Sequence, residues 1–174
     1  DLKQTLPVSE RAWKMPGSRM FIDPKMKVPV EDLIKGMIVQ SGNDATMALA
    51  EGVGGTAEQF VKMMNDQAAA MGLKGSAYKN PEGLTEPGHT TTARDLAVIT
   101  AHLQHDFPQY MHYYSTKQYR YPGTPALVAC VRAGQQRGRQ ADNRQTTQGR
   151  PPVQLNVSDL QSPSPGVAAG VVPR

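Results

Sequence analysis

Two helical patterns meet in the stretch LIKGMIVQSGNDATMALAEGV, residues 33–53. Before the break, apolar residues recur at spacings of three and four, as they do along one face of a helix: Leu33, Ile34, Met37 and Ile38. After the break, a second stripe follows at Ala45, Leu49 and Val53. Because Ser41 comes three residues after Ile38 and four after Met37, its hydroxyl is expected to point inward with the core residues.

A serine, a glycine and an asparagine therefore lie between two helices, at Ser41, Gly42 and Asn43. Gly42 is expected to let the backbone turn without a side-chain penalty. Two polar groups held against a cleft suit a proton relay or an amide-binding position. For the tripeptide alone the simpler interpretation is a capped helix start, because Ser and Asn cap helices and Gly and Asn tolerate turns.

The remaining pattern predicts short strands and further helices. Thr56 with Gln59, and Thr92 with Asp95, have the spacing of helix caps. The methionine stripe of the third helix is expected to belong to the core. The expected strands are 4–9, 19–22 and 117–121, and the expected helices are 29–41, 44–54, 56–71 and 92–107, with one more helical turn at 110–114.

Composition divides the 174 residues into two domains, 1–122 and 123–174. The second segment contains no Lys, His, Met or aromatic residue, and its six Arg and two Asp supply the whole net charge of +4. Such a composition predicts a low-complexity disordered tail, or out-of-frame translation. The basic charge therefore does not indicate a nucleic-acid groove on residues 1–122. RNA binding by the tail arginines is an alternative, although no aromatic residues interleave with them.

The remaining cysteine, histidine and aspartate residues do not indicate a further site. The single cysteine, Cys130, excludes an internal disulfide. His102 and His105 are spaced i, i+3 and His112 follows, but solvent-facing histidines are favoured over a metal site because no acidic or cysteine cluster joins them. Asp44 and Asp95 are interpreted as first-turn charges. Residues 1–4 do not show the charged-then-apolar pattern of a leader peptide, and no apolar run reaches the ~20 residues that a membrane helix needs. Because the sequence does not begin with Met, its true start, with a leader, is expected upstream.

A series of segments resembles the D-alanyl-D-alanine carboxypeptidases, the low-molecular-mass penicillin-binding proteins related to serine β-lactamases. The series runs through residues 5–121 in one order: PGSRMF (16–21), VPVEDLIKG (28–36), QSGNDA (40–45), FV (60–61), MN (64–65), MGL (71–73), NPEGL (80–84) and TTARDLA (91–97). The resemblance implies an α+β, β-lactamase/transpeptidase-like fold, of which residues 1–122 are mainly the helical portion.

The resemblance also implies a serine-type reaction through an acyl-enzyme, built from Ser-x-x-Lys, Ser-x-Asn and Lys-Thr-Gly elements. Ser41 and Asn43 would be the catalytic and substrate-binding residues. Ser41 would relay the proton between the lysine and the leaving amine, and Asn43 would hold the lysine and bind a substrate amide. The implied substrate is the peptidoglycan pentapeptide and the implied inhibitors are β-lactams, with no metal, organic cofactor or nucleic acid.

The sequence departs from this pattern in two places, because Ser-x-x-Lys is absent ahead of Ser41 and Lys-Thr-Gly is absent after residues 119–121. We therefore expect the chain alone to be inactive as a carboxypeptidase. The alternative is a catalytically dead remnant or a helical interaction module. The implied location is the periplasm, at the outer face of the cytoplasmic membrane, with leader and anchor outside this chain.

Overall fold

A computed structural model of the chain describes residues 1–123. Its elements, in chain order, are β1 (Thr5–Pro7), α1 (Glu10–Trp13), β2 (Lys27–Pro29), α2 (Val30–Gln40), α3 (Asn43–Gly54), α4 (Ala57–Ala70), α5 (Ala93–Asp106) and the 3-10 helix η1 (Pro108–Tyr113). The predicted tail, from residue 124 onward, and Cys130 lie outside the described residues. Within them, no helix is both long enough and apolar enough to cross a membrane.

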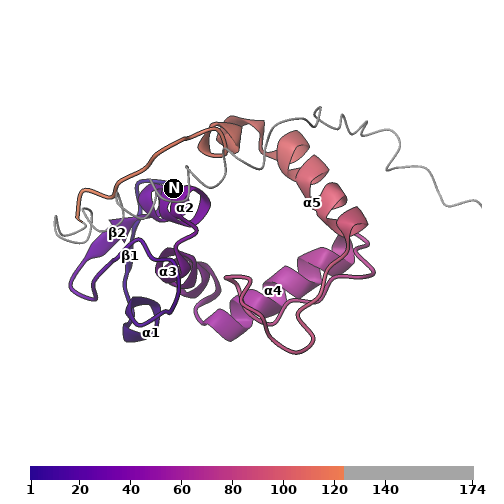
Figure 1. Cartoon of the computed structure of the whole chain (residues 1–174), viewed down its shortest axis with the longest axis horizontal. Coiled ribbons are helices and arrows are strands. Elements are labelled where there is room, and N and C mark those ends of the chain that lie inside the picture. Colours follow the sequence, from indigo (N-terminus) through magenta and orange to yellow (C-terminus); the bar gives the residue numbers. More distant parts are fainter. Residues whose placement is uncertain (124–174) are drawn as a thin grey trace, which may run out of the picture.

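The core gathers around α3, which contacts α1, α2, α4 and β1. β1 and β2 pair antiparallel, with Leu6 opposite Val28. Apolar side chains from these elements and from the loop before β2 are almost fully buried: Met20, Ile22, Val28, Leu33, Ala45 and Ala48. Figure 1 shows β1, β2, α1, α2 and α3 gathered at one end of the molecule, from which α4 leads away while α5 and η1 bring the chain back toward α2.

The helices α4 and α5 begin at the predicted caps. The Thr56 side chain accepts a hydrogen bond from the Gln59 N–H at 3.1 Å, and the Thr92 side chain accepts one from the Asp95 N–H at 3.1 Å. A helix end needs such a partner because its first N–H groups have none within the helix. These two predictions from local sequence are confirmed.

The prediction that the methionine stripe of α4 is core is wrong for Met63, whose side chain is 47% exposed. Within α4 the buried residues are Ala57 and Ala68. In α5 the buried residue is Asp95, whereas Leu96 is 51% exposed. Among the described elements, α4 contacts chiefly α3 and α5 contacts chiefly η1, and a large apolar side chain of each helix stays exposed, Met63 in α4 and Leu96 in α5.

The strand predictions are confirmed in part. β1 lies within the predicted segment 4–9, and the helical turn predicted at 110–114 is present as the larger part of the 3-10 helix η1. Residues 19–22 and 117–121 are not strands, and β2 was not predicted. A strand needs a neighbouring backbone as hydrogen-bond partner. In the described structure the N–H groups of residues 20–22 bond to a side chain instead.

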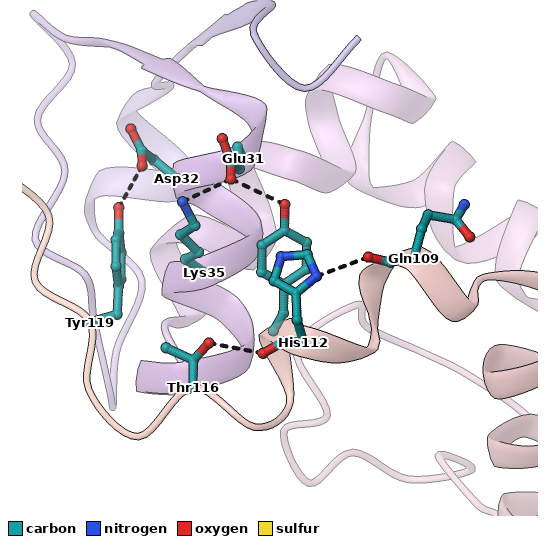
Figure 2. A network of polar contacts seen from close by, with 8 residues as sticks. Glu31, Asp32, Lys35, Gln109, His112, Thr116 and Tyr119 are labelled. Carbon is teal, nitrogen blue, oxygen red and sulfur yellow. Dashed lines mark hydrogen bonds and ion pairs between the residues drawn. The ribbon is translucent and has the colours of Figure 1, made fainter.

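The segment 117–121 lies along α2, held by side chains (Figure 2). The Tyr119 hydroxyl donates to Asp32 Oδ1 at 2.9 Å, and Gln40 Nε2 donates to the Tyr119 carbonyl at 2.7 Å. The residue before Asp32, Glu31, accepts from the Tyr113 hydroxyl at 3.2 Å and pairs with Lys35 at 2.8 Å. Burial, and then the hydrogen bond to Asp32, raise the pKa of Tyr119, so this side chain remains a donor at neutral pH.

We expect Tyr119→Phe to lower the free energy of unfolding by about 1–2 kcal/mol, because it leaves the Asp32 carboxylate without this donor. Tyr114→Phe is the matched control, since the Tyr114 side chain is 57% exposed. Urea unfolding followed by circular dichroism measures both variants. Equal stability of the two variants would contradict the role given to the Tyr119–Asp32 bond.

Candidate active site

The predicted motif lies in the short connection between α2 and α3. α2 ends at Gln40 and α3 begins at Asn43. Ser41 adopts a left-handed backbone conformation, with φ 53° and ψ 41°, and its N–H donates to the Gly36 carbonyl. The Gly42 N–H donates to the same carbonyl at 3.1 Å. Ser41 is exposed, whereas every residue from 42 to 50 is buried.

The prediction that the Ser41 hydroxyl points inward is therefore wrong. The helix ends at Gln40. Ser41 itself is left-handed, and this conformation takes its side chain out of the helical register. The role expected of Gly42 also changes, because its φ of −75° is ordinary. Gly42 is needed for space: a Cβ there would lie 3.2 Å from the Gly36 carbonyl oxygen and 3.2 Å from the Met20 nitrogen.

Asn43 is buried and faces the loop that precedes β2. Its Nδ2 donates to the Pro16 carbonyl at 2.8 Å, and its backbone N–H donates to the Ser18 carbonyl at 2.8 Å. The interpretation of the tripeptide as a side-chain cap is not confirmed, since Gly42 occupies the N-cap position of α3 and no side chain caps it. Because a carbonyl only accepts, the amide group of Asn43 must turn its NH2 toward Pro16.

Asp44 is buried and extensively hydrogen-bonded, which its interpretation as a first-turn charge did not predict. It does lie in the first turn of α3, but its side chain is only 1% exposed. Its carboxylate accepts from the N–H groups of Met20 at 2.7 Å, Phe21 at 2.7 Å, Ile22 at 3.3 Å and Ala45 at 2.9 Å. The signal that could have revealed it is an acidic residue directly before residues 45–50, which are apolar except for Thr46.

The other candidates lie elsewhere. His102 and His105 are exposed and each lies within hydrogen-bond distance of Asp106, at 3.2 and 2.7 Å. Within residues 1–123 no three His, Cys, Asp or Glu side chains are grouped so as to hold a metal ion.

Asp95 accepts from the Ser76 hydroxyl at 2.8 Å and from the Gly75 N–H at 2.9 Å. These hydrogen bonds, the one from Ser76 most of all, lower the pKa of Asp95. Asp95 thus joins the loop before α5 to that helix.

His112 lies on η1, away from the Ser-Gly-Asn connection. Its ring packs against the Tyr113 ring with 4.1 Å between centroids, and its Nδ1 lies 2.8 Å from the Gln109 carbonyl (Figure 2). The site itself therefore offers an exposed hydroxyl at Ser41 and a fixed amide at Asn43. Those two groups can transfer a proton and hold a hydrogen-bonding partner, but they do not supply a nucleophile with its own base.

Comparison with known proteins agrees with the resemblance. Residues 1–134 match the family model of peptidase S11, described as D-alanyl-D-alanine carboxypeptidase. The chain is 45% identical over 95 residues to the D-alanyl-D-alanine carboxypeptidase DacF of Bacillus subtilis, covering 55% of this chain and 24% of that protein. It is 42% identical over 117 residues to DacA of Haemophilus influenzae, covering 66% of this chain and 30% of that protein.

Solved structures give the same result for the fold. Penicillin-binding protein 5 from Haemophilus influenzae matches with a TM-score of 0.68 and 38% identity, over 71% of this chain and 37% of that chain. Penicillin-binding protein 6B from Escherichia coli matches with a TM-score of 0.67 and 36% identity, over 71% and 41%. The expected α+β, transpeptidase-like fold is confirmed. The chain spans about a quarter to a third of the length of the curated relatives it matches.

We expect Ser41→Gly to raise the free energy of unfolding by roughly 0.5–1 kcal/mol, the left-handed penalty less the extra entropy of glycine in the unfolded chain. Ser9→Gly is the control, because Ser9 has an ordinary φ of −75° and its side chain caps α1. That control should lose a few tenths of a kcal/mol. Thermal melting of both variants tests this, and a lower melting temperature for Ser41→Gly would disprove the strain at Ser41.

Proposed function

The chain belongs to the D-alanyl-D-alanine carboxypeptidase family, and on that basis we propose that it supplies the Ser-x-Asn element of a serine-type D-Ala-D-Ala carboxypeptidase. The substrate is the peptidoglycan stem pentapeptide, from which the enzyme removes the terminal D-alanine. The observation that carries this proposal is the contrast at the α2–α3 connection. Ser41 is exposed to a substrate, while the neighbouring Asn43 is buried and held by two hydrogen bonds.

The proposed reaction proceeds through an acyl-enzyme. The serine of a Ser-x-x-Lys element attacks the carbonyl carbon of the last peptide bond, and the lysine takes its proton. As the C–N bond breaks, the leaving D-alanine amine receives a proton through the Ser41 hydroxyl. Water then hydrolyses the ester and releases the shortened peptide. A β-lactam would acylate the same serine, which makes penicillin an inhibitor.

In this scheme Asn43 accepts a hydrogen bond through its Oδ1 atom. One proton of its NH2 group is used by the Pro16 carbonyl, so the Oδ1 atom and the second N–H proton are what it can offer. A carbonyl oxygen suits an ammonium group, which has donors and no acceptor. This supports the assignment that Asn43 holds the lysine, with the second N–H available for a substrate amide.

The proposed setting is outside the cytoplasm, at the bacterial cell wall, where peptidoglycan is found. The 174 residues contain neither Ser-x-x-Lys ahead of Ser41 nor Lys-Thr-Gly after Tyr121. We therefore propose that the chain alone is inactive, and that the gene, read from well upstream of codon 1 to well past codon 174, encodes both elements.

A fluorescent penicillin tests this proposal on two proteins, the 174-residue chain and the full product of the gene. We expect covalent labelling of the full product and none of the chain, and labelling of the full product should slow by roughly 10²–10⁴-fold in Ser41→Ala, the usual range for a proton-transfer group. Ser115→Ala is the control, because the Ser115 hydroxyl bonds only locally, to the His112 carbonyl.

Two outcomes would contradict the proposal. Labelling of the 174-residue chain would disprove its inactivity. A full product that takes no label, and whose gene encodes neither missing element, would leave a non-catalytic remnant whose function must be sought in binding.

A further inference from the structure

We propose that Asp44 is a positioning residue of the active site, which fixes Asn43 through the loop of residues 16–22. The inference rests on the proposed function. Asp44 follows the Ser-Gly-Asn motif directly, yet its carboxylate bonds to the loop before β2 rather than facing solvent. The proposal explains why a buried acidic residue stands at the start of α3.

The geometry of the loop matches an anion. Met20, Phe21 and Ile22 present three successive N–H groups to the one carboxylate. Phe21 has a φ of 65°, which residues other than Gly, Asn and Asp rarely adopt. Successive N–H groups around a left-handed residue form a concave anion-binding arrangement. In this molecule the anion is the Asp44 carboxylate, supplied from a position more than twenty residues later in the chain.

The Asp44 carboxylate is surrounded by N–H donors in place of water. No Lys, Arg or His of residues 1–123 forms an ion pair with it. A buried carboxylate without a cation depends on hydrogen bonds to offset its lost hydration. The N–H groups of residues 20–22 supply these bonds, and the left-handed backbone at Phe21 lets them converge on one carboxylate.

The same loop also holds Asn43. Pro16 and Ser18 provide the carbonyls that accept from the Asn43 side chain and backbone, each at 2.8 Å. Gly17, between them, passes so close that a Cβ there would lie 2.9 Å from Asn43 Nδ2. Asn43 thus binds one end of the loop, at residues 16 and 18, and Asp44 binds the other end, at residues 20–22. Loss of the Asp44 carboxylate would release the carbonyls that orient the Asn43 amide.

The test replaces the carboxylate in Asp44→Asn, which keeps the shape but puts an NH2 group where a second acceptor was. Asp23→Asn is the matched control, because the Asp23 carboxylate also accepts a backbone N–H, that of Lys25 at 2.8 Å, but in an exposed turn. Amide hydrogen exchange by NMR on the whole chain compares the N–H of Asn43 with that of Phe60, which bonds to the Thr56 carbonyl in α4.

We expect Asp44→Asn to raise the ratio of the Asn43 exchange rate to the Phe60 exchange rate at least ~tenfold, as local opening does. Asp23→Asn should leave the ratio unchanged. A carboxylate that merely stabilises the whole chain would accelerate both amides in parallel, and an unchanged ratio in Asp44→Asn overturns the proposal.

If Asp44→Asn does not fold, exchange in the unmodified chain at low denaturant decides the matter. The N–H groups of Met20, Phe21, Ile22 and Asn43 should then converge on a single opening free energy. Independent opening of Asn43 would overturn the proposal.

In the full gene product, Asp44→Asn should lower kcat for D-alanine release more than it raises KM, whereas Asp23→Asn should change neither. If Asn43 loosens but the unmodified product takes no penicillin, the proposed function fails, and what stands is that Asp44 fixes Asn43 through the loop of residues 16–22. If penicillin labels the unmodified product but Asn43 does not loosen, the positioning role fails and the proposed function stands.

Discussion

The hydrogen bonds between the buried Asp44 carboxylate and the loop before β2 hold the core and the Ser-Gly-Asn connection together. It joins the start of α3 to the N–H groups of residues 20–22, and so brings Met20 and Ile22 into the core beside α2. Charge burial is unfavourable unless hydrogen bonds replace hydration. The requirement for several N–H donors at one point therefore explains why the loop before β2 is curled rather than extended as a strand.

Close packing at the end of α2 follows from the position of Met20. A Cβ on Gly36 would overlap Met20 Sδ, and the Gly36 carbonyl accepts both N–H groups that end the helix. The helix consequently stops one residue before Ser41, which turns left-handed and becomes exposed. The exposed Ser41 and the fixed Asn43 therefore depend on Gly36 and Gly42, because the absence of a Cβ at these two positions allows the close approach to Met20.

The part of the chain after α3 is held differently. α4 and α5 contribute few buried side chains, and the loop between them is fastened by polar contacts such as those of Asn65 with Tyr78 and of Asp95 with Ser76. The segment after η1 returns to α2 through Tyr119. A chain that spans about a third of its relatives' length leaves such helices with apolar faces that no described element covers.

Features that depend on neighbours along the chain could be predicted from the sequence alone. The helices, the caps at Thr56 and Thr92 and the break at residues 41–43 follow from spacing and local motifs, and the family was indicated by the resemblance of segments within residues 5–121. The folded structure was needed to show that Ser41 is exposed, that residues 19–22 are not a strand and that Asp44 is a buried acceptor. Each of these depends on contacts between segments distant in sequence, whose hydrogen bonds and burial no local pattern encodes.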